Sequence, residues 1–474
     1  MEYSSGSFFM SQYCAQVMAL LSGQRQCLVR VRATAWRCVC FTQGGRAAEP
    51  LPRGGALNMY GMKEQARHIT TELVHHSYQP PQAFAAPQPA VHKASTVIFD
   101  SVQDMRTRRW LDKSGYTYGL HGTPTTYQLE ERLCSLEGGK QCLLVPSGLC
   151  AISTVALGLL SAGDEVLIPD NAYGPNKDFA EHELARWGIR HAWYNPMDVA
   201  DLQARISPAT KLVWLEAPGS VSMEFPDLIA LVQACQARGV TTVLDNTWGA
   251  GLAFQPFDLL ADGGSLAVDV SAHALTKYPS GGGDVLMGSI TTVNQALHMR
   301  IKLTHMRLGI GIGANDAEAV LRALPSMALR YHAQDQSARQ LAAALQRQSG
   351  VVQLLHPAFE GAPGHACWQQ LCGAANQGQG AAAGIFSVVI DARFEQAAID
   401  RFCDSLQLFK LGYSWGGPMS LVMPYDIDSM RANGRGCVQA GTVVRFCIGL
   451  EDTQDLLQDL AQAWEQAFGQ AWQH

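Results

Sequence analysis

The sequence predicts an α/β fold with a mainly parallel sheet that helices cover on both faces. Two observations support this prediction. Short, wholly apolar segments typical of buried strands alternate with stretches of helical spacing between about residues 62 and 325. Hydrophobic residues make up 47% of the 474 residues and charged residues only 16%, which indicates a large core and excludes a mainly disordered chain.

Six apolar segments account for the predicted strands, at residues 141–145, 165–169, 211–215, 240–244, 266–272 and 285–290. Apolar helices are predicted at 149–163 and 228–238. Past about residue 325 the pattern changes to helices and two alternating strands, at 384–391 and 442–448, and 456–468 has helical spacing again. The later part therefore predicts a second, smaller domain.

Charge and cysteine usage exclude several classes of function. The 35 Lys and Arg against 41 Asp and Glu give a net charge of −6, which argues against nucleic acid as the partner. No apolar run approaches the ~20 residues of a membrane helix. The 13 cysteines include no CxxC pair, so we expect free thiols, a reducing compartment and no metal site. We expect a cytoplasmic protein without a membrane partner.

Residues 1–60 differ in character from the rest of the chain. They contain four cysteines but only two acidic residues, and no helical or strand period runs through them for long. We expect a non-folding extension or a misassigned start, with Met59 or Met62 as the working start. The arginine-rich, acid-poor composition leaves an organellar transit peptide as the weaker alternative.

Three groups lie where predicted strands end, the edge at which an open parallel sheet binds ligands. Gly148 and Leu149 open a helix, whose free N–H groups suit an anion, although a plain helix cap explains them equally well. Asp245 is the first charge after an apolar strand and needs a cation or donors, unless it caps the next turn. Lys277 precedes a glycine triplet, and burial would make its amine a nucleophile or base; a solvated surface lysine is the alternative. Together they form the set that pyridoxal 5'-phosphate (PLP) requires.

The residues around these groups resemble the Cys/Met-metabolism family of PLP-dependent enzymes. The matching motifs run from about residue 65 to the C-terminus: YTYG at 116–119, LEGG at 136–139, PSG at 146–148, NAYG at 171–174, EAPGS at 216–220, DNTW at 245–248, TKY at 276–278, YSWGG at 413–417 and RFCIGLED at 445–452. The resemblance implies PLP fold type I, the aspartate-aminotransferase-like fold, with a mainly parallel seven-stranded sheet. It also implies an arm at 61–122 that contacts a neighbouring subunit, a large PLP-binding domain at 123–324 and a small α+β domain at 325–474.

The resemblance also assigns roles to residues. Lys277 would bind PLP covalently and carry the substrate Cα proton, Asp245 would keep the pyridine nitrogen protonated, and Tyr173 would stack on the ring and assist proton transfer. From the residues alone, Tyr173 reads equally well as a core aromatic. The phosphate would be bound by Gly148, Leu149, Thr276 and Tyr118 of a neighbouring subunit, and the amino-acid substrate by Arg445, Tyr413, Ser414 and Trp415. Shared active sites imply a dimer, and the family norm implies a homotetramer.

Within the family, the motifs at 413–417 and 218–220 are most similar to those of the cystathionine β-lyase subgroup. This similarity implies a carbon–sulfur β-lyase that converts L-cystathionine to homocysteine, pyruvate and ammonia in methionine biosynthesis. A γ-acting relative (cystathionine γ-lyase or γ-synthase), a broad cysteine-S-conjugate or cystine β-lyase, and a catalytically silent ligand-binding relative remain alternatives. Leu120 and Leu275 stand where relatives carry an arginine and a serine for the phosphate, which predicts altered PLP affinity, with His121 as a substitute for the arginine.

Overall fold

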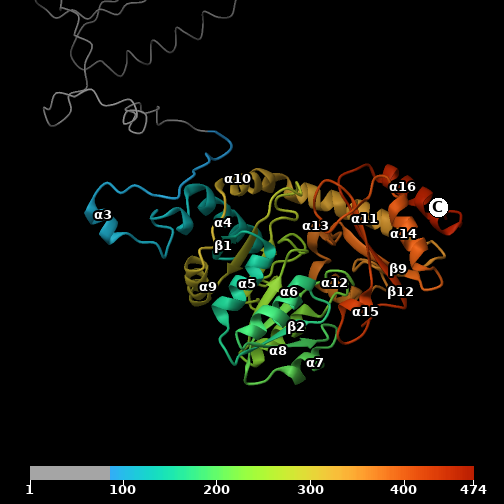
Figure 1. The fold of residues 1–474 in the computed structure, drawn as a ribbon, viewed down its shortest axis with the longest axis horizontal. Coiled ribbons are helices and arrows are strands. Elements are labelled where there is room, and N and C mark those ends of the chain that lie inside the picture. The colour runs from blue at the N-terminus through green and yellow to red at the C-terminus, as the bar shows by residue number, and fades with distance from the viewer. Residues whose placement is uncertain (1–85, 474) are drawn as a thin grey trace, which may run out of the picture. The chain divides into compact units, whose positions relative to one another are not determined.

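The large sheet confirms the predicted α/β fold. A computed structural model gives the structure of residues 86–473, in which seven strands lie in the order β1-β7-β6-β5-β4-β2-β3 (Figure 1). Only β7 runs antiparallel to its neighbours within this sheet. The strands are β1 (Gln141–Val145), β2 (Glu165–Pro169), β3 (Arg190–Tyr194), β4 (Thr210–Glu216), β5 (Thr241–Asp245), β6 (Val270–Ala274) and β7 (Gly288–Thr292).

Helices bury both faces of this sheet, as its wholly apolar strands require. In β4, Leu212 and Trp214 belong to the hydrophobic cluster that includes α5, whereas Val213 and Leu215 belong to the one that includes α8. The helices of this region are α4 (Pro124–Glu137), α5 (Gly148–Leu159), α6 (Gly174–Asp178), α7 (Val199–Arg205), α8 (Leu228–Ala237), α9 (Gln295–Arg307) and α10 (Ala314–Ala323).

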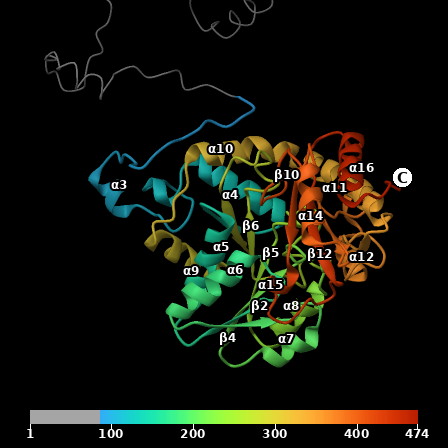
Figure 2. The ribbon, with the colours of Figure 1, turned by 45° about the vertical axis from the view of Figure 1, so that its right-hand side comes forward.

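The C-terminal part of the chain builds a second sheet, in the order β10-β11-β12-β9-β8 (Figure 2). Its own core lies between these strands and the helices α11, α14 and α16. The strands are β8 (Val351–Leu355), β9 (Ile385–Asp391), β10 (Lys410–Leu411), β11 (Leu421–Tyr425) and β12 (Gly441–Cys447). The helices are α11 (Met327–Gln346), α12 (His365–Cys372), α13 (Ala375–Gly378), α14 (Gln396–Ser405), α15 (Ile427–Met430) and α16 (Thr453–Phe468).

The two sheets share one hydrophobic cluster. Leu244 at the end of β5 and Trp248 belong to the same cluster as Tyr331 on α11 and Val443 on β12. Residues from Ala86 onward accordingly form one compact unit. The division at residues 324 and 325 stays a prediction.

The segment before α4 is the least packed part of residues 86–473. It carries the short helix α3 (Val102–Thr107), which projects from the side of the molecule where α4 and α9 lie (Figure 1). Ile98 is 85% exposed and Val102 is 58% exposed, so this segment leaves apolar surface uncovered. The predictions for residues 1–60, and for the start of the arm at 61–85, lie outside the described residues.

Several elements differ from the sequence prediction. The predicted strand at 266–272 starts too early, because β6 begins at Val270. Leu266 and Val268 are buried all the same, but as loop residues packed on the core. The strands β3, β8, β10 and β11 were not predicted. No helix within residues 86–473 is long and apolar enough to cross a membrane.

Candidate active site

The carboxyl ends of β4, β5 and β6 bring three charged side chains to one edge of the large sheet. Glu216 ends β4 and Asp245 ends β5, and the two residues are direct neighbours in the parallel register. Asp245 is in turn paired with Ala272 of β6. Lys277 lies in the turn that follows β6. The sheet topology therefore joins Asp245 and Lys277, which are far apart in sequence.

The Lys277 amine lies against a loop of the C-terminal part of the chain. Its Nζ donates a hydrogen bond of 2.8 Å to Ser414 Oγ and lies 5.7 Å from the centre of the Trp415 ring. A glycine is needed at 416, because its φ is +73° and a Cβ there would lie 2.9 Å from the Tyr278 amide nitrogen. The structure thus places two predicted substrate-binding residues beside Lys277.

Burial makes this lysine easier to deprotonate. Desolvation, with the nearby Arg445 charge as the second cause, lowers the pKa of Lys277 from 10.5 to about 8. A substantial fraction of the amine is then neutral near physiological pH. A neutral amine can act as a nucleophile or as a base.

Asp245 and Glu216 form a pair of buried carboxyl groups. Burial raises the pKa of Asp245, although the Thr247 backbone N–H donates to its Oδ1 at 3.0 Å. Burial and the adjacent Asp245 charge raise the pKa of Glu216 to about 8. Glu216 is therefore largely protonated at neutral pH, since like charges at this spacing disfavour double ionisation. The remaining negative charge at Asp245 would be stabilised by a cationic ligand group.

Glu216 also connects the other predicted residues of the site. One of its carboxyl oxygens accepts from the Tyr173 backbone N–H at 2.9 Å, and the other accepts from Ser220 Oγ at 2.7 Å. The Tyr173 side chain is 40% exposed, so it is available to a ligand and is not a core aromatic. Burial raises the pKa of Tyr173, as do the Asp245 and Glu216 carboxylates.

Arg445 projects from the middle of β12 towards this edge of the large sheet. It is only 7% exposed, and one of its terminal nitrogens donates to the Ser220 carbonyl at 3.2 Å. Its guanidinium lies 5.0 Å from the centre of the Tyr425 ring. Within residues 86–473 its buried Nε has no hydrogen-bond partner. Arg445 is therefore a buried arginine, and its unpaired donor fits a carboxylate ligand.

The turn into α5 has the features of an anion site. Ser147 Oγ accepts from the Cys150 N–H at 3.0 Å, which leaves the first N–H groups of the helix, at Gly148 and Leu149, pointing out of the helix end. A Cβ at 148 would lie 2.6 Å from the Ala274 Cβ, so only glycine fits. Leu149 is 37% exposed, which leaves this helix end accessible.

The residues just before Lys277 are placed differently from the prediction. The Thr276 hydroxyl is hydrogen-bonded at 3.3 Å to both the carbonyl oxygen and the N–H of Met287, and its phosphate role stays a prediction. The Leu275 side chain is fully buried in the cluster that includes Leu129 and Val320. A hydroxyl at 275 would point into that core. Ala274, and not Leu275, is the residue that faces the Gly148 turn, and the expected effect of Leu275 on PLP affinity stays a prediction.

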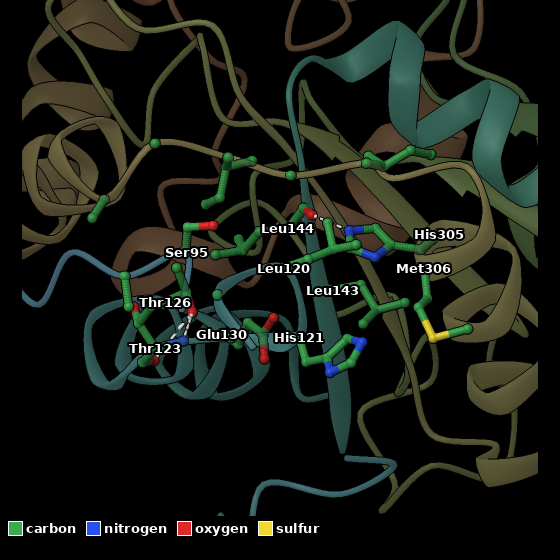
Figure 3. Close-up of a pocket in the computed structure, with 18 of the residues that line it drawn as sticks. Ser95, Leu120, His121, Thr123, Thr126, Glu130, Leu143, Leu144, His305 and Met306 are labelled. Atoms are coloured by element: carbon green, nitrogen blue, oxygen red, sulfur yellow. Dashed lines mark hydrogen bonds between the residues drawn. The ribbon is translucent and has the colours of Figure 1, made fainter. Parts of the chain in front are cut away.

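The predicted arm lines a separate pocket of about 530 Å³. Figure 3 shows Leu120 and His121 in its wall, with Leu144 and His305 beside them. Apart from His121, the predicted substitute for an arginine, no residue with a predicted cofactor or substrate role lines this pocket. Burial and nearby cations lower the pKa of His121, and its role in place of an arginine stays a prediction.

Tyr118, the residue predicted to bind a neighbour's phosphate, is 46% exposed. Its backbone pairs with that of Thr96, which fixes the arm locally and leaves the side chain outside the core. Tyr413 is likewise largely exposed. The predicted roles of both tyrosines stay predictions.

The donor set fits PLP. A lysine of lowered pKa, an anion-accepting helix end, a buried carboxylate and a half-exposed tyrosine come together, as this cofactor requires. The buried, unpaired Nε of Arg445 adds a site for a carboxylate.

Three residues of the site were not predicted to have a role, namely Glu216, Ser220 and Tyr425. Glu216 carries the same sequence signal as Asp245, an acid directly after an apolar strand, and that signal would have identified it. Ser220 and Tyr425 have no such local signal, since their roles come from contacts with Glu216 and Arg445.

Comparisons with known proteins agree with this geometry. The sequence profile of the Cys/Met metabolism PLP-dependent enzymes matches residues 70–465. A putative cystathionine beta-lyase of Rhizobium johnstonii is 37% identical over 405 residues, which are 84% of this chain and 96% of the relative. A cystathionine beta-lyase of Bordetella avium is 37% identical over 85% of this chain and 98% of the relative. The crystal structure of metB from Corynebacterium glutamicum superposes with a TM-score of 0.71 at 26% identity, over 84% of this chain and 98% of that one.

Proposed function

The chain belongs to the Cys/Met-metabolism family of PLP-dependent enzymes, and we propose that it is a carbon–sulfur β-lyase that cleaves L-cystathionine to homocysteine, pyruvate and ammonia. This reaction would serve methionine biosynthesis. The observation that supports the proposal most strongly is the placement of Lys277 Nζ 2.8 Å from Ser414 Oγ, next to Trp415, on the loop that resembles the β-lyase subgroup. The names of the relatives point in the same direction.

The large sheet supplies the residues that hold the cofactor. Lys277 would form the covalent link, the N–H groups of Gly148 and Leu149 would bind the phosphate, and Asp245 would pair with the pyridine nitrogen. Bound PLP would supply an electron sink for the electrons released at the substrate Cα. Tyr173 would stack on the ring and help to exclude water.

Lys277 moves the proton. Its amine has a pKa of about 8, so its neutral form takes the Cα proton near physiological pH, and a base whose pKa lies close to the operating pH is the most effective. The hydrogen bond to Ser414 Oγ holds Nζ on the side of Trp415. The lysine therefore has a fixed position from which to act.

Arg445 orients the substrate. A guanidinium binds a carboxylate with two parallel hydrogen bonds, which fixes the direction of the Cα–H bond. The Ser220 carbonyl and the Tyr425 ring hold the guanidinium in place. With the α-carboxylate bound there, the β-sulfur substituent is the group that leaves.

We further propose that the protein is a cytoplasmic homotetramer built from dimers that share active sites. The exposed Tyr118 and the apolar side chains of Ile98 and Val102 support a subunit contact through the arm. Tyr118 would then reach the phosphate of the neighbouring subunit.

A spectrum combined with product analysis tests the proposal. The purified protein with PLP should show a violet-edge absorption band that shifts on addition of L-cystathionine, and pyruvate should accumulate in the same cuvette. Formation of 2-oxobutyrate with cysteine would instead identify a γ-lyase. A stable band with no product would identify a catalytically silent relative.

A further inference from the structure

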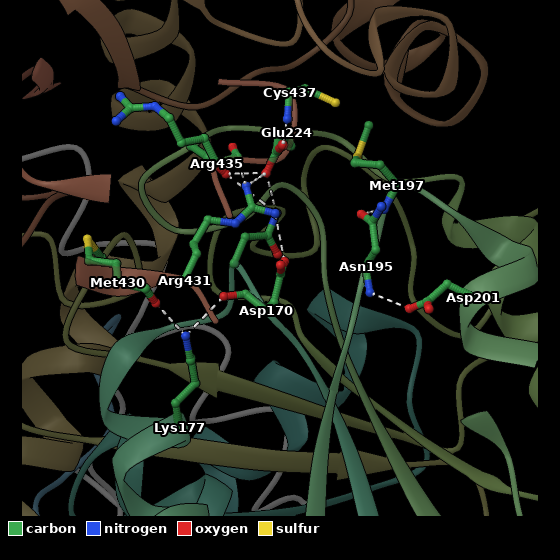
Figure 4. A network of polar contacts seen from close by, with 12 residues as sticks. Asp170, Lys177, Asn195, Met197, Asp201, Glu224, Met430, Arg431, Arg435 and Cys437 are labelled. Carbon is green, nitrogen blue, oxygen red and sulfur yellow. Dashed lines mark hydrogen bonds and ion pairs between the residues drawn. The ribbon is translucent and has the colours of Figure 1, made fainter. Parts of the chain in front are cut away.

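A buried ion cluster lies at the same sheet edge as the candidate active site. Arg431 follows α15, and its side chain is only 2% exposed. Its guanidinium lies between two buried carboxylates, 2.7 Å from Asp170 Oδ1 and 2.7 Å from Glu224 Oε2 (Figure 4). The same guanidinium donates to the Arg435 carbonyl at 3.0 Å. One side chain of the C-terminal part of the chain thus binds two carboxylates of the large-sheet region.

Lys177 is joined to this cluster through two backbone carbonyls. It lies on α6, and its Nζ donates to the Asp170 carbonyl at 3.1 Å and to the Met430 carbonyl. Arg431 therefore pairs with both carboxylates, and the half-buried Lys177 is joined to the same cluster through backbone carbonyls. Within residues 86–473 the buried Nε of Arg431 has no hydrogen-bond partner. Such a cluster is costly to break, since a lost partner leaves a buried charge uncompensated.

Both carboxylates lie on segments that carry active-site residues. Asp170 directly follows β2 and precedes the turn of Tyr173 by three residues. Glu224 accepts from Asn171 Nδ2 at 3.0 Å, which attaches the Tyr173 turn to the cluster at a second point. Glu224 also belongs to the segment after β4 that contains Ser220, whose carbonyl accepts from Arg445.

The arginine itself lies on the segment that leads into β12, the strand of Arg445. Glu224 Oε1 accepts from the Cys437 N–H at 2.7 Å on this segment. The cluster consequently joins the turn of Tyr173, the segment of Ser220 and the approach to β12.

We propose that Arg431 is a positioning residue, which sets the distance between the Tyr173 turn and the Arg445 guanidinium through its two ion pairs. It touches neither substrate nor cofactor. The inference rests on the proposed function, in which an amino-acid carboxylate binds to Arg445. A small displacement of that guanidinium would weaken substrate binding, because such sites tolerate little misplacement.

The test compares Arg431→Met and Arg431→Lys with the wild-type holoenzyme. Affinity for L-alanine, which has the carboxylate but no leaving group at Cβ, is read from the change in the cofactor absorption band. The temperature is one at which circular dichroism shows every variant fully folded. We expect Arg431→Met to keep the cofactor band and to bind L-alanine about tenfold to a hundredfold more weakly. Arg431→Lys should lie between Arg431→Met and wild type.

Arg339→Met is the matched control. Arg339 pairs with the buried Asp335 at 2.7 Å, but neither residue contacts the Tyr173 turn or β12 through a hydrogen bond or ion pair in the described structure. This variant should lose thermal stability and keep wild-type affinity. Wild-type affinity in the folded Arg431→Met variant would overturn the inference. Because L-alanine binding needs no elimination, a wild type without lyase turnover would refute the proposed function and leave this comparison intact.

Discussion

Two groups of buried charges lie at the same edge of the large sheet, and they are built in opposite ways. In the first, Arg431 forms ion pairs with both Asp170 and Glu224, and Lys177 donates to the Asp170 backbone carbonyl. In the second, Lys277 is hydrogen-bonded to a serine hydroxyl and has no carboxylate within ion-pair distance among residues 86–473, and Asp245 lies beside another carboxyl group. Within residues 86–473, each carboxylate of the first group has an ion-pair partner, and neither carboxyl group of the second has one.

The difference explains where chemistry is possible. A compensated cluster fixes geometry, because each charge already has its partner. A cluster of buried charges without partners has shifted pKa values: the pKa of Lys277 is lowered to about 8 and that of Glu216 is raised to about 8. Shifts of this kind are typical of functional sites. The compensated group is therefore expected to respond to mutation in stability and position, and the undercompensated one in reactivity.

The largest effect is expected for Lys277→Ala. This variant loses both the covalent link to PLP and the base, so kcat for pyruvate formation should fall by at least about 10³-fold. The change removes a buried amine that has no buried counter-ion, so the folded state should persist by circular dichroism. Lys410→Ala, which alters an exposed lysine, is the control and should retain full turnover. Normal turnover of Lys277→Ala would refute the assignment.

A stability measurement on the cofactor-free protein sharpens the contrast between the two groups. Glu224→Gln removes a partner of Arg431 and should lower the free energy of unfolding by about 3 kcal/mol. Asp245→Asn removes a carboxylate whose pKa burial raises, so it should raise the free energy of unfolding of the cofactor-free protein. Turnover of the PLP-loaded variant should fall. Urea denaturation of both variants checks the two signs. Equal destabilisation by both would remove the distinction between the groups.

Arg445→Lys should have a smaller effect, on substrate binding. Lysine keeps the charge but loses the two parallel hydrogen bonds, each typically worth about 1.5–3 kcal/mol when charged. KM for L-cystathionine should therefore rise about 10- to 100-fold, with a smaller change in kcat. An unchanged KM would place the carboxylate site elsewhere.

The smallest effect is a pH dependence. The folded-state pKa of Lys277 is lowered to about 8, so the neutral amine, and with it the rate of covalent PLP capture by the cofactor-free protein, should rise about tenfold between pH 7 and 9. Because the unfolded lysine titrates higher, the cost of burying it is present below pH 8 and is relieved as the pH rises towards 10. Stopped-flow absorbance measures the capture rate. A rate that rises only near pH 10 would indicate an ordinary lysine.

Much of this arrangement could be predicted from the sequence, for a physical reason. Parallel strands are buried on both faces and therefore appear in the sequence as apolar runs, so most of the large sheet was predicted. An acid or amine at the end of such a run is easily recognised as a candidate site residue. The edge strand β3, with the sequence RHAWY, lacks such a run and was not predicted. The predicted start of β6 was too early because Leu266 and Val268 are buried loop residues, and such residues are as apolar as those of a buried strand.

The contacts between the two sheets were beyond sequence reasoning. The hydrogen bond from Lys277 to Ser414 joins residues 137 positions apart, and the Arg431 cluster joins residues more than 200 positions apart. No local period or spacing encodes such pairs. The sequence around Arg431, IDSMRANGRG at 427–436, contains no apolar run and gives no signal of burial.

The central claim is that Lys277 carries the cofactor in a PLP-dependent lyase. Borohydride reduction of the holoenzyme, followed by peptide mass spectrometry, tests it most directly. The account predicts one phosphopyridoxyl group per chain, on Lys277, and loss of the pyruvate-forming activity in proportion to its incorporation. Labelling of a different lysine, or full activity after stoichiometric reduction of Lys277, would contradict it.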